Sequence, residues 1–223
     1  MTADIIRPIP WDSRAFGIDC FEIDHACEHA LTRAMEIPGH YTVRVSPLGD
    51  KSLLYRYGFY YVDTLIEPVC NKNKLIAYRH PDCHIDADTP LDVLLPMCMN
   101  SFQHGRFHRD HNIPNEAADR RYAQWLTQLR KEGSVFGLYF QCQLAGFVAC
   151  HQEKLLLHAM HEQFRGKGLA KYFWTEVSER LFHAGAESVS SSISAANLPS
   201  LNLYSRLGFR FTKVVDVYHK MNH

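Results

Sequence analysis

The sequence predicts a mixed α/β fold, and three observations carry that prediction. Three short β-rich runs follow one another at 135–141, 145–153 and 154–161, with tight connections between them. The spacing of apolar residues then changes from a period of two to one of about 3.6, which indicates a helix directly after the strands. Strand-like and helix-like segments continue to alternate up to the last residues, as is typical of layered α/β architectures.

Two helices are expected before these strands. The segment that starts at Asp88 offers Asp or Thr as N-cap and Pro90 in its first turn, followed by apolar residues at helical spacing. A second helix is expected over 116–131, with one apolar face made of Ala118, Tyr122, Trp125 and Leu129. The polar and aromatic segment between them, residues 101–115, is expected to be a loop of the kind that often carries binding residues.

The three β-rich runs are expected to form an antiparallel meander. The helix that follows them ends near Gly185, and its apolar stripe consists of Ala170, Phe173, Val177 and Leu181. A strand over 187–194, a short helix over 198–207 stopped by Gly208, and a final strand or strand pair over 209–221 complete the expected order.

Residues 1–75 are expected to form a smaller N-terminal α/β lobe, and residues 76–223 the main domain. Residues 42–62 align without a gap on residues 192–212, matching Leu53 to Leu203, Arg56 to Arg206, Gly58 to Gly208 and Phe59 to Phe209. The lobe could therefore be a degenerate half-copy, although strand, helix, glycine and strand follow one another in many unrelated chains. Pro47 and Leu54 stand where the second segment has Asn197 and Tyr204, so such a copy would serve architecture.

The charge balance argues against a nucleic-acid partner. Lys plus Arg and Asp plus Glu both number 24, so the whole chain creates no field that would favour nucleic acid or an anionic membrane. The opening MTADIIRPIPW lacks the pattern of a secretory signal, and the chain has no uninterrupted apolar run of about 18 residues. A cytoplasmic protein without membrane insertion is expected.

Cysteine and histidine are frequent, yet neither pattern predicts a metal site. The seven cysteines are an odd number, widely spread and without a CxxC pair, which favours reduced thiols over disulfides or zinc. The densest histidine group is His104, His108 and His111, with no matching Cys or His cluster nearby. No metal is expected.

The segment Gln163–Ala170 has the pattern of an anion-binding turn. It follows a predicted strand and opens a helix, and its two glycines let consecutive backbone N–H groups approach an anion at the positive end of the helix dipole. A pyrophosphate would fit there, and neither a P-loop nor a dinucleotide fingerprint is present. Arg165 and Lys167 could add attraction or be ordinary solvated cations. The alternative is a glycine-softened turn in front of an amphipathic helix.

This segment resembles the coenzyme A loop of the GCN5-related N-acetyltransferase (GNAT) superfamily, whose pattern is Gln or Arg, two residues, Gly, one residue, then Gly or Ala. Downstream, AANLPSLNLYSRLGF resembles the second signature of that superfamily, an Asn at a strand exit followed by a short helix that carries Tyr and ends in Gly-Phe. Both signatures occur in the right order, separated by one helix and one strand. The resemblance implies the GNAT fold and acetyl-CoA as acyl donor.

The resemblance also assigns site residues. It implies that a strand segment pairs with the pantetheine arm, that the loop binds the pyrophosphate, and that Asn197 and Ser200 assist. The implied coenzyme-binding residues are Ala159, Met160, His161, Gln163, Phe164, Arg165, Gly166, Lys167, Gly168, Leu169, Ala170, Asn197 and Ser200. Tyr204 matches the tyrosine that faces the thioester sulfur and is the implied catalytic residue, unless it is only a packed aromatic.

The chemistry explains the need for such a phenol. Attack of an amine on the thioester gives a tetrahedral intermediate whose collapse expels a thiolate, which a phenol can protonate or stabilise. The proton acceptor for the amine stays open among a water chain and four side chains, His108, Asp110, Glu153 and His158. Transfer through a cysteine is disfavoured, because no cysteine lies within either signature.

A narrower resemblance concerns the acceptor. The entry WDSRAFG, the segment 101–126 and the Asn-to-Tyr signature look like the dTDP-fucosamine acetyltransferases, which acetylate a nucleotide-linked deoxy-amino sugar for surface polysaccharide (lipopolysaccharide) synthesis. On this resemblance, Arg106 and His108, with Arg109 nearby, would bind the diphosphate, and Tyr122 with Phe107 and Trp125 would offer an apolar platform. Tyr122 and Trp125 could equally be core residues. A homodimer is possible.

Two alternatives remain open from the sequence. The same reaction could act on another amine, such as a protein N-terminus, a polyamine or an antibiotic. The chain could also be a non-catalytic acyl-CoA-binding module, although the presence of both Asn197 and Tyr204 speaks against this.

Overall fold

In the computed structural model, which describes residues 6–223, eleven strands form one mixed sheet, and this confirms the mixed α/β fold class. The order across the sheet is β1 (Ile6–Pro8), β2 (Cys20–Ile23), β3 (Gly39–Val45), β11 (Arg210–Asn222), β4 (Tyr60–Asn71), β9 (Ser188–Ser191), β8 (Lys154–Met160), β7 (Gln143–His151), β6 (Ser134–Phe140) and β5 (Cys83–Asp86), with β10 (Ile193–Ser194) paired to β4.

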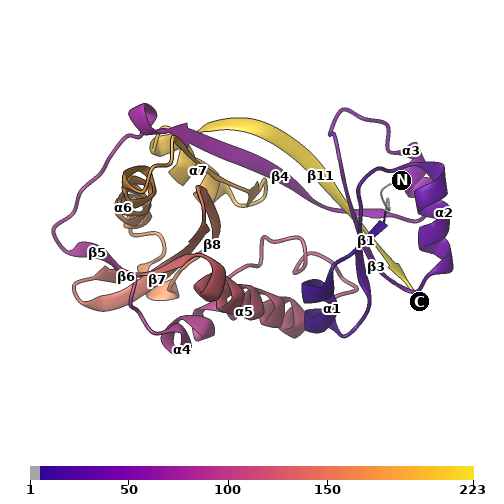
Figure 1. The fold of residues 1–223 in the computed structure, drawn as a ribbon, viewed down its shortest axis with the longest axis horizontal. Coiled ribbons are helices and arrows are strands. Elements are labelled where there is room, and N and C mark those ends of the chain that lie inside the picture. The colour runs from indigo at the N-terminus through magenta and orange to yellow at the C-terminus, as the bar shows by residue number, and fades with distance from the viewer. Residues whose placement is uncertain (1–5) are drawn as a thin grey trace.

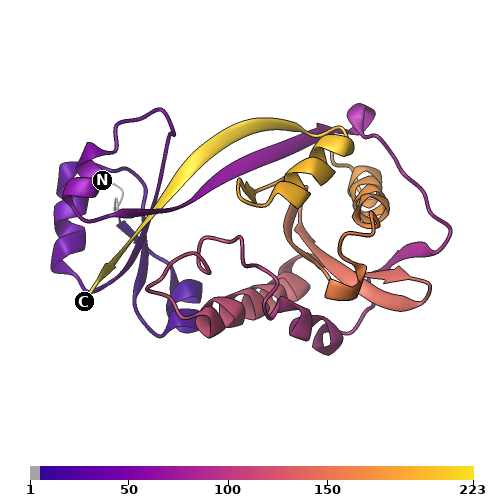
Figure 2. The same ribbon diagram turned by 180° about the vertical axis from the view of Figure 1, so that it is seen from behind.

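A long ribbon of β4 and β11 joins the two ends of the molecule (Figures 1 and 2). The two strands are antiparallel and pair from Tyr60 with His219 to Val69 with Arg210. At one end lie β1 to β3 with helices α2 (Glu28–Glu36) and α3 (Ser52–Arg56). At the other end lie β5 to β8 and helix α6 (Ala170–His183). The final segment is thus one long strand rather than a strand pair.

The predicted meander is confirmed, and it forms the centre of the second half. Strands β6, β7 and β8 are antiparallel neighbours. Helix α5 (Asn115–Glu132) packs on the face that carries Phe147 and Ala149, while α6 packs on the face that carries Val148 and Cys150. Because both faces of β7 are covered, its sequence is continuously apolar instead of alternating.

Two elements differ from the sequence predictions. The helix expected from Asp88 is reduced to α4 (Leu91–Leu94), a single turn followed by a 3₁₀ turn at Leu95–Cys98, because Pro96 removes a backbone donor and blocks continuation of the α-helix. The strand expected over 187–194 is divided into β9 and β10. This division matters for the site, since the two parts pair with different strands.

The described part of the N-terminal region repeats an order of elements seen near the C-terminal end. Strand β3, helix α3, Gly58 at φ +74° and β4 correspond to β10, helix α7 (Leu198–Arg206), Gly208 at φ +88° and β11. The positive φ angles explain why both positions are glycine. The division at residue 75 and a common origin of the two segments stay predictions, and residues 1–5 of the expected lobe lie outside the described range.

The remaining short elements are α1 (Pro10–Phe16), which packs against α5, and 3₁₀ turns at Lys72–Lys74 and Glu162–Phe164. All seven cysteines, which lie within the described residues, are free thiols. Within residues 6–223, no helix combines the length and apolar character that crossing a membrane requires.

Candidate functional site

The site lies where two neighbouring strands separate. Within the described residues, β8 and β9 pair in parallel only at Lys154 with Ser190 and at Leu155 with Ser191. Beyond this point β10 turns to pair with β4, and β8 continues alone. A cavity of about 1080 Å³ opens in the gap, bordered by 155–160 of β8 on one side and by 192–194 on the other.

A β-bulge on β8 marks the start of the separation. Ala149 of β7 pairs with Leu157, whereas the next residue, Cys150, pairs with Leu155, so Leu156 is the extra residue on β8. A bulge increases local twist and re-aims the strand, and bulges are frequent beside active sites. The bulge thus explains how β8 leaves its parallel partner.

The turn Gln163–Ala170 closes one end of the cavity. Gly166 and Gly168 have φ angles of +73° and +71°, and a Cβ on either would have no heavy atom within 4 Å. Within the described residues, the backbone N–H groups from Gly166 to Ala170 make no hydrogen bond to the chain. Five free donors at the start of α6 form an anion-binding arrangement of the kind expected from the sequence.

The two cations of this turn have different surroundings. Arg165 donates to the carbonyl of Met160 at 2.8 Å and to Ser101 Oγ at 3.0 Å, so its guanidinium ties the turn to β8 and to the 101–113 segment. Lys167 Nζ lies 5.4 Å from the centre of the Phe164 ring. Arg165 therefore has a structural task that the sequence did not reveal.

Most of the predicted coenzyme-binding residues border the cavity. Those that do are Ala159, Met160, Phe164, Arg165, Gly166, Gly168, Leu169, Ala170, Asn197 and Ser200. Within the described chain, His161, Gln163 and Lys167 are not part of the cavity wall. The His161 side chain instead accepts a hydrogen bond from Gln163 N at 3.3 Å, which shapes the turn from within.

Tyr204 lies behind the cavity wall. Its side chain is fully buried, and its hydroxyl is 3.2 Å from Nε2 of His158, which does border the cavity. Burial raises the pKa of Tyr204 to about 12 and lowers the pKa of His158 to about 4. At neutral pH the phenol thus keeps its proton, and the imidazole is unprotonated and can accept the hydrogen bond from it. Contrary to the simplest form of the sequence expectation, Tyr204 reaches the cavity through His158.

The other end of the cavity carries three arginines. Arg121 pairs with Asp12 at 2.9 Å, and Arg44 pairs with Glu22. Arg106 has neither an ion pair nor a hydrogen bond within the described residues, and its Nε is buried without a partner. Burial and the nearby Arg121 lower the pKa of Arg106. Of the three arginines at this end, Arg106 is therefore the one without an acidic partner among the described residues.

The structure divides the predicted acceptor-binding residues. Arg106 and Tyr122 border the cavity, as do Phe107 and Trp125. His108 is not part of the wall within the described chain, because its buried ring places Nε2 3.0 Å from Asp119 Oδ1. Phe107 and Tyr122 are also buried in the core beside α5, so the aromatic platform stays a prediction, whereas His108 has a partner elsewhere.

The candidate proton acceptors separate in the same way. Of the four, His158 borders the cavity, His108 is bonded to Asp119, and Glu153 is exposed in the turn between β7 and β8. Asp110 is buried in a separate network. Another carboxylate of the wall is Asp63, whose only signal in the sequence was a charged residue inside an apolar β-rich run.

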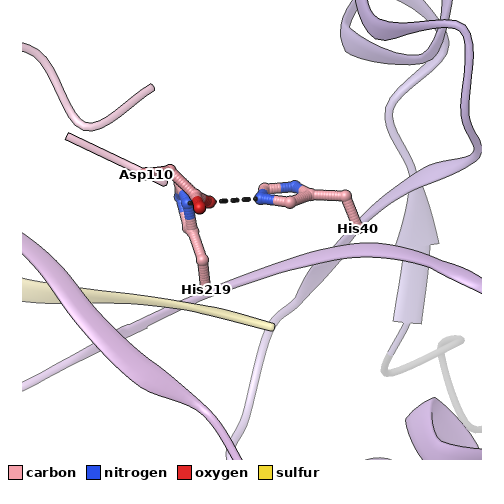
Figure 3. A group of neighbouring side chains, drawn as sticks. All are labelled: His40, Asp110 and His219. Atoms are coloured by element: carbon pink, nitrogen blue, oxygen red, sulfur yellow. Dashed lines mark hydrogen bonds and ion pairs between the residues drawn. The ribbon is translucent and has the colours of Figure 1, made fainter. Parts of the chain in front are cut away.

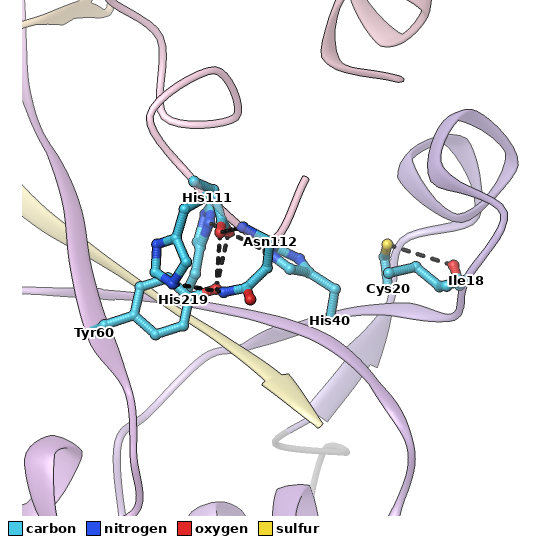
Figure 4. Close-up of polar contacts among 8 residues, drawn as sticks. Ile18, Cys20, His40, Tyr60, His111, Asn112 and His219 are labelled. Atoms are coloured by element: carbon cyan, nitrogen blue, oxygen red, sulfur yellow. Dashed lines mark hydrogen bonds and ion pairs between the residues drawn. The ribbon is translucent and has the colours of Figure 1, made fainter. Parts of the chain in front are cut away.

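Asp110 lies at the centre of a buried hydrogen-bond network (Figures 3 and 4). Its Oδ2 is 3.0 Å from His40 Nε2 and 2.7 Å from His219 Nδ1, while Tyr60 donates to Oδ1 at 2.9 Å. Two ligands of one tetrahedral zinc ion lie about 3.3 Å apart, given zinc–ligand distances of about 2.0–2.1 Å. The 2.7 Å distance therefore fits a direct hydrogen bond, and we interpret the cluster as a structural junction between β3, β11, β4 and the 101–113 segment.

Comparisons with known proteins agree with this geometry. Residues 99–209 match the model of the Acetyltransferase (GNAT) family, a range that contains the cavity strands, the turn and α7. No curated protein sequence matches the chain.

Solved structures show the same fold. A GCN5-related N-acetyltransferase from Sphaerobacter thermophilus has a TM-score of 0.62 at 12% identity, with 87% of this chain and 65% of that chain covered. A conserved protein of unknown function from Staphylococcus epidermidis has a TM-score of 0.68 at 14% identity, covering 100% and 94%. A tandem GNAT protein from the clavulanic acid biosynthesis pathway has a TM-score of 0.55 at 12% identity, covering 91% and 75%. At these identities the likeness concerns the fold, and the chain spans about two thirds of the Sphaerobacter protein.

Proposed function

The chain belongs, through residues 99–209, to the GNAT acetyltransferase family, and on this premise we propose that it moves an acetyl group from acetyl-CoA to the amine of a nucleotide-linked amino sugar. The proposed reaction is a direct transfer that serves surface polysaccharide synthesis in the cytoplasm. One observation supports the acyl transfer above all. The cavity between β8 and β10 ends at a turn with five backbone donors that no residue of 6–223 engages, and a pyrophosphate tail would need such donors.

We propose a single direction for the coenzyme in this arrangement. The pyrophosphate would lie against the amides of 166–170, and the pantetheine arm would follow the unpaired edge of β8 toward His158. Asn197 accepts from Ser200 N at 3.2 Å through its carbonyl oxygen, which leaves its amide N–H₂ free to donate into the cavity. The thioester would then lie beside the Tyr204–His158 pair, which is proposed to supply the proton of the leaving thiolate.

Thiol release tests the proposal. The purified protein is incubated with acetyl-CoA and a panel of amines that includes dTDP-4-amino-4,6-dideoxygalactose, spermidine, an aminoglycoside and a peptide with a free N-terminus. Release of CoA with the nucleotide sugar alone supports the full proposal. Release with another amine alone supports the family reaction and overturns the acceptor. Binding of acetyl-CoA without release for any amine would identify a non-catalytic module.

The glycines of the turn yield a first prediction. Gly168→Ala should raise the Kd for acetyl-CoA about tenfold, because an alanine at φ +71° costs about 1–2 kcal/mol and would tilt the amides away from the pyrophosphate. The measurement is calorimetric titration with acetyl-CoA. Gly17→Ala is the matched control, since Gly17 has φ +72° and equally open surroundings but lies after α1, away from the turn. Equal Kd values for both variants would contradict the assignment.

The unpaired guanidinium supports an anionic acceptor. A charged donor without a partner favours a phosphate or carboxylate, which accepts two parallel hydrogen bonds from an arginine. Trp125 is partly exposed and borders the cavity together with the buried Phe107 and Tyr122, which suits the base or the sugar of a nucleotide sugar. This combination favours the nucleotide amino sugar over a polyamine, which would be repelled by Arg106.

Arg106→Gln should therefore raise the KM for a diphosphate-bearing acceptor by a factor of about 30, which corresponds to the loss of about 2 kcal/mol of a charge-assisted contact. The KM for acetyl-CoA should stay unchanged. Arg120→Gln is the control, because Arg120 is exposed on α5 and is absent from the cavity wall described here. An unchanged acceptor KM in Arg106→Gln would show that Arg106 does not bind an anionic group of the acceptor. Steady-state kinetics in both substrates measure the effect.

The N-terminal lobe is also part of the proposal. The repeated order of strand, helix, glycine and strand, together with the likeness to a tandem GNAT protein, supports an origin as a half-copy of the acetyltransferase domain. In this chain the lobe contributes Asp12, Glu22 and Arg44 to the cavity wall, so we expect it to contact the acceptor. A homodimer remains a proposal that the mass in solution would test.

A further inference from the structure

Asp63 is a fully buried carboxylate whose two oxygens have different surroundings. Oδ1 accepts hydrogen bonds from Thr64 N at 2.9 Å, from Ser194 Oγ at 2.7 Å and from Arg109 at 2.8 Å. Oδ2 is buried and has no hydrogen-bond partner within the described residues. A buried carboxylate oxygen without a donor is uncommon in folded proteins and calls for an explanation, such as a catalytic task, stored strain or a bound water or ion.

This carboxylate belongs to the wall that faces β8. Asp63 borders the cavity, and so do Leu65 and Ser194, which pair with each other where β10 meets β4. His158 borders the same cavity from β8. The coenzyme loop follows directly after β8, whereas Asp63 lies on the strand that leads into the N-terminal lobe. Asp63 is therefore on the side from which an acceptor would approach a thioester held along β8.

The charges around Asp63 suit an exchange of protons. Burial raises the pKa of Asp63, while Ser194 and Arg109 act in the opposite direction, and the net effect is a carboxylate that is a stronger base than an exposed one. The charged groups that face it are Arg109 and Arg106 of the 101–113 segment, with the neutral His158 across the cavity. The ammonium of an acceptor could donate the hydrogen bond that Oδ2 lacks.

We propose that Oδ2 of Asp63 binds the ammonium of the acceptor and takes a proton from it, which leaves the free amine that attacks the thioester. This inference rests on the proposed function and adds the proton acceptor that the reaction needs. The ammonium N–H bond breaks and the Asp63 O–H bond forms. The nitrogen lone pair then forms the C–N bond, and the C–S bond breaks as the intermediate collapses. The thiolate takes a proton from the Tyr204–His158 pair, which regains a proton when a second N–H bond of the nitrogen breaks. The amide, free CoA and one proton, which Asp63 releases to water, are the products.

Arg109 and Ser194 are positioning residues in this scheme. They hold Oδ1, which leaves Oδ2 as the oxygen without a donor among the described residues. Arg109 is partly exposed and pairs with Asp63 from the outer side, so its removal should leave the cavity itself intact. The two residues make it possible to separate the chemical role of Asp63 from a structural one.

The test uses Asp63→Asn with dTDP-4-amino-4,6-dideoxygalactose, or with the fastest amine of the panel above if that sugar is inert. We expect kcat/KM for the acceptor to fall at least about 100-fold at pH 7, with an unchanged Kd for acetyl-CoA. The pH profile is the decisive readout. Residual activity of Asp63→Asn should rise about tenfold per pH unit until the amine is deprotonated, because the variant must wait for free amine, whereas the wild type levels off at lower pH.

Arg109→Gln is the matched variant. It removes the ion pair but keeps the base, so its maximal rate should fall far less than that of Asp63→Asn, while the acid limb of its profile should move to higher pH, because the pKa of Asp63 rises without the charge of Arg109. Equal losses in Arg109→Gln and Asp63→Asn, with parallel pH profiles, would show that the ion pair alone matters and would overturn the inference. Full activity of Asp63→Asn would also overturn it. A wild-type protein that acetylates no amine would instead refute the proposed function and this inference with it.

Discussion

Tyr204→Phe is expected to lower the turnover number by a factor of about 10²–10⁴ without unfolding the protein. The phenylalanine ring keeps the edge-on contact with Phe209, whose ring centre is 4.9 Å away, so the packing around α7 is retained. Only the hydroxyl is lost, and with it the hydrogen bond to His158 at 3.2 Å. The leaving thiolate then lacks the proton that the Tyr204–His158 pair is proposed to supply.

The pKa values define the conditions of this experiment. Because burial raises the pKa of Tyr204 to about 12, the phenol should stay protonated up to pH 9–10, and the turnover of the wild type should not fall in that range through loss of this proton. Because burial lowers the pKa of His158 to about 4, the pair should keep its neutral form down to about pH 5. A pH range of about 6–9 is thus suitable for comparing the two proteins.

The control for Tyr204→Phe is a phenol removed elsewhere. Tyr139 lies on β6, and its hydroxyl is 3.2 Å from Thr89 Oγ1. Tyr139 is not among the described residues of the cavity wall, so Tyr139→Phe should leave turnover unchanged. Calorimetry should give the same Kd for acetyl-CoA in both variants and in the wild type. A Tyr204→Phe protein with wild-type turnover would show that the hydroxyl has no part in the reaction.

Asp110→Ala is expected to have the largest effect on stability, a loss of about 3–5 kcal/mol in the free energy of unfolding. Asp110 is 1% exposed and accepts hydrogen bonds from His40, His219, Tyr60 and the backbone N–H of Asn112. Its removal leaves several buried donors without an acceptor, each of which costs about 1–3 kcal/mol before relaxation. Urea unfolding followed by circular dichroism measures the loss.

The same network predicts the acid sensitivity of the fold. Burial lowers the pKa of His219 to about 3, and although burial alone would raise the pKa of Asp110, the hydrogen bonds from His219 and His40 hold it well below its usual range. Both folded pKa values are depressed, so the stabilisation is complete above the unfolded values of about 6.5 and 3.9. Stability should fall first below about pH 6.5, when the unfolded histidine binds a proton, and further below about pH 4.

Asp82→Asn is the control for Asp110→Ala, because Asp82 is exposed and its side chain only accepts from Gln141 at 3.2 Å. It should change the free energy of unfolding by less than about 0.5 kcal/mol. If Asp110→Ala were equally stable, or if its unfolding free energy followed the wild-type pH curve below pH 4, the carboxylate would not hold the junction together. Zinc has no place in this prediction, and added chelator should not alter either curve.

Much of the fold could be predicted because it depends on neighbours along the chain. The meander, α5, α6 and α7 follow from the period of their apolar residues. The end of α7 follows from Gly208, because glycine readily adopts the positive φ angle found there. The helix expected from Asp88 was wrong in length, because Pro96 outweighs the good N-terminal signals before it. The break between β9 and β10 has no signal in residues 187–194, since it results from a change of partner strand.

The same difference separates the residues of the site: some follow from local sequence, and others are placed only by tertiary contacts. By itself the sequence determined the turn Gln163–Ala170, since two glycines, a preceding strand and a following helix are local features that orient backbone donors whatever surrounds them. Only the tertiary structure decided that Tyr204 meets the cavity through His158, that His108 is bonded to Asp119, and that Asp63 borders the cavity. The partners of these side chains lie 11, 46 and 131 residues away along the chain. Their burial and bonding are set when β4, β8 and β10 come together, and no pattern along the chain encodes that contact.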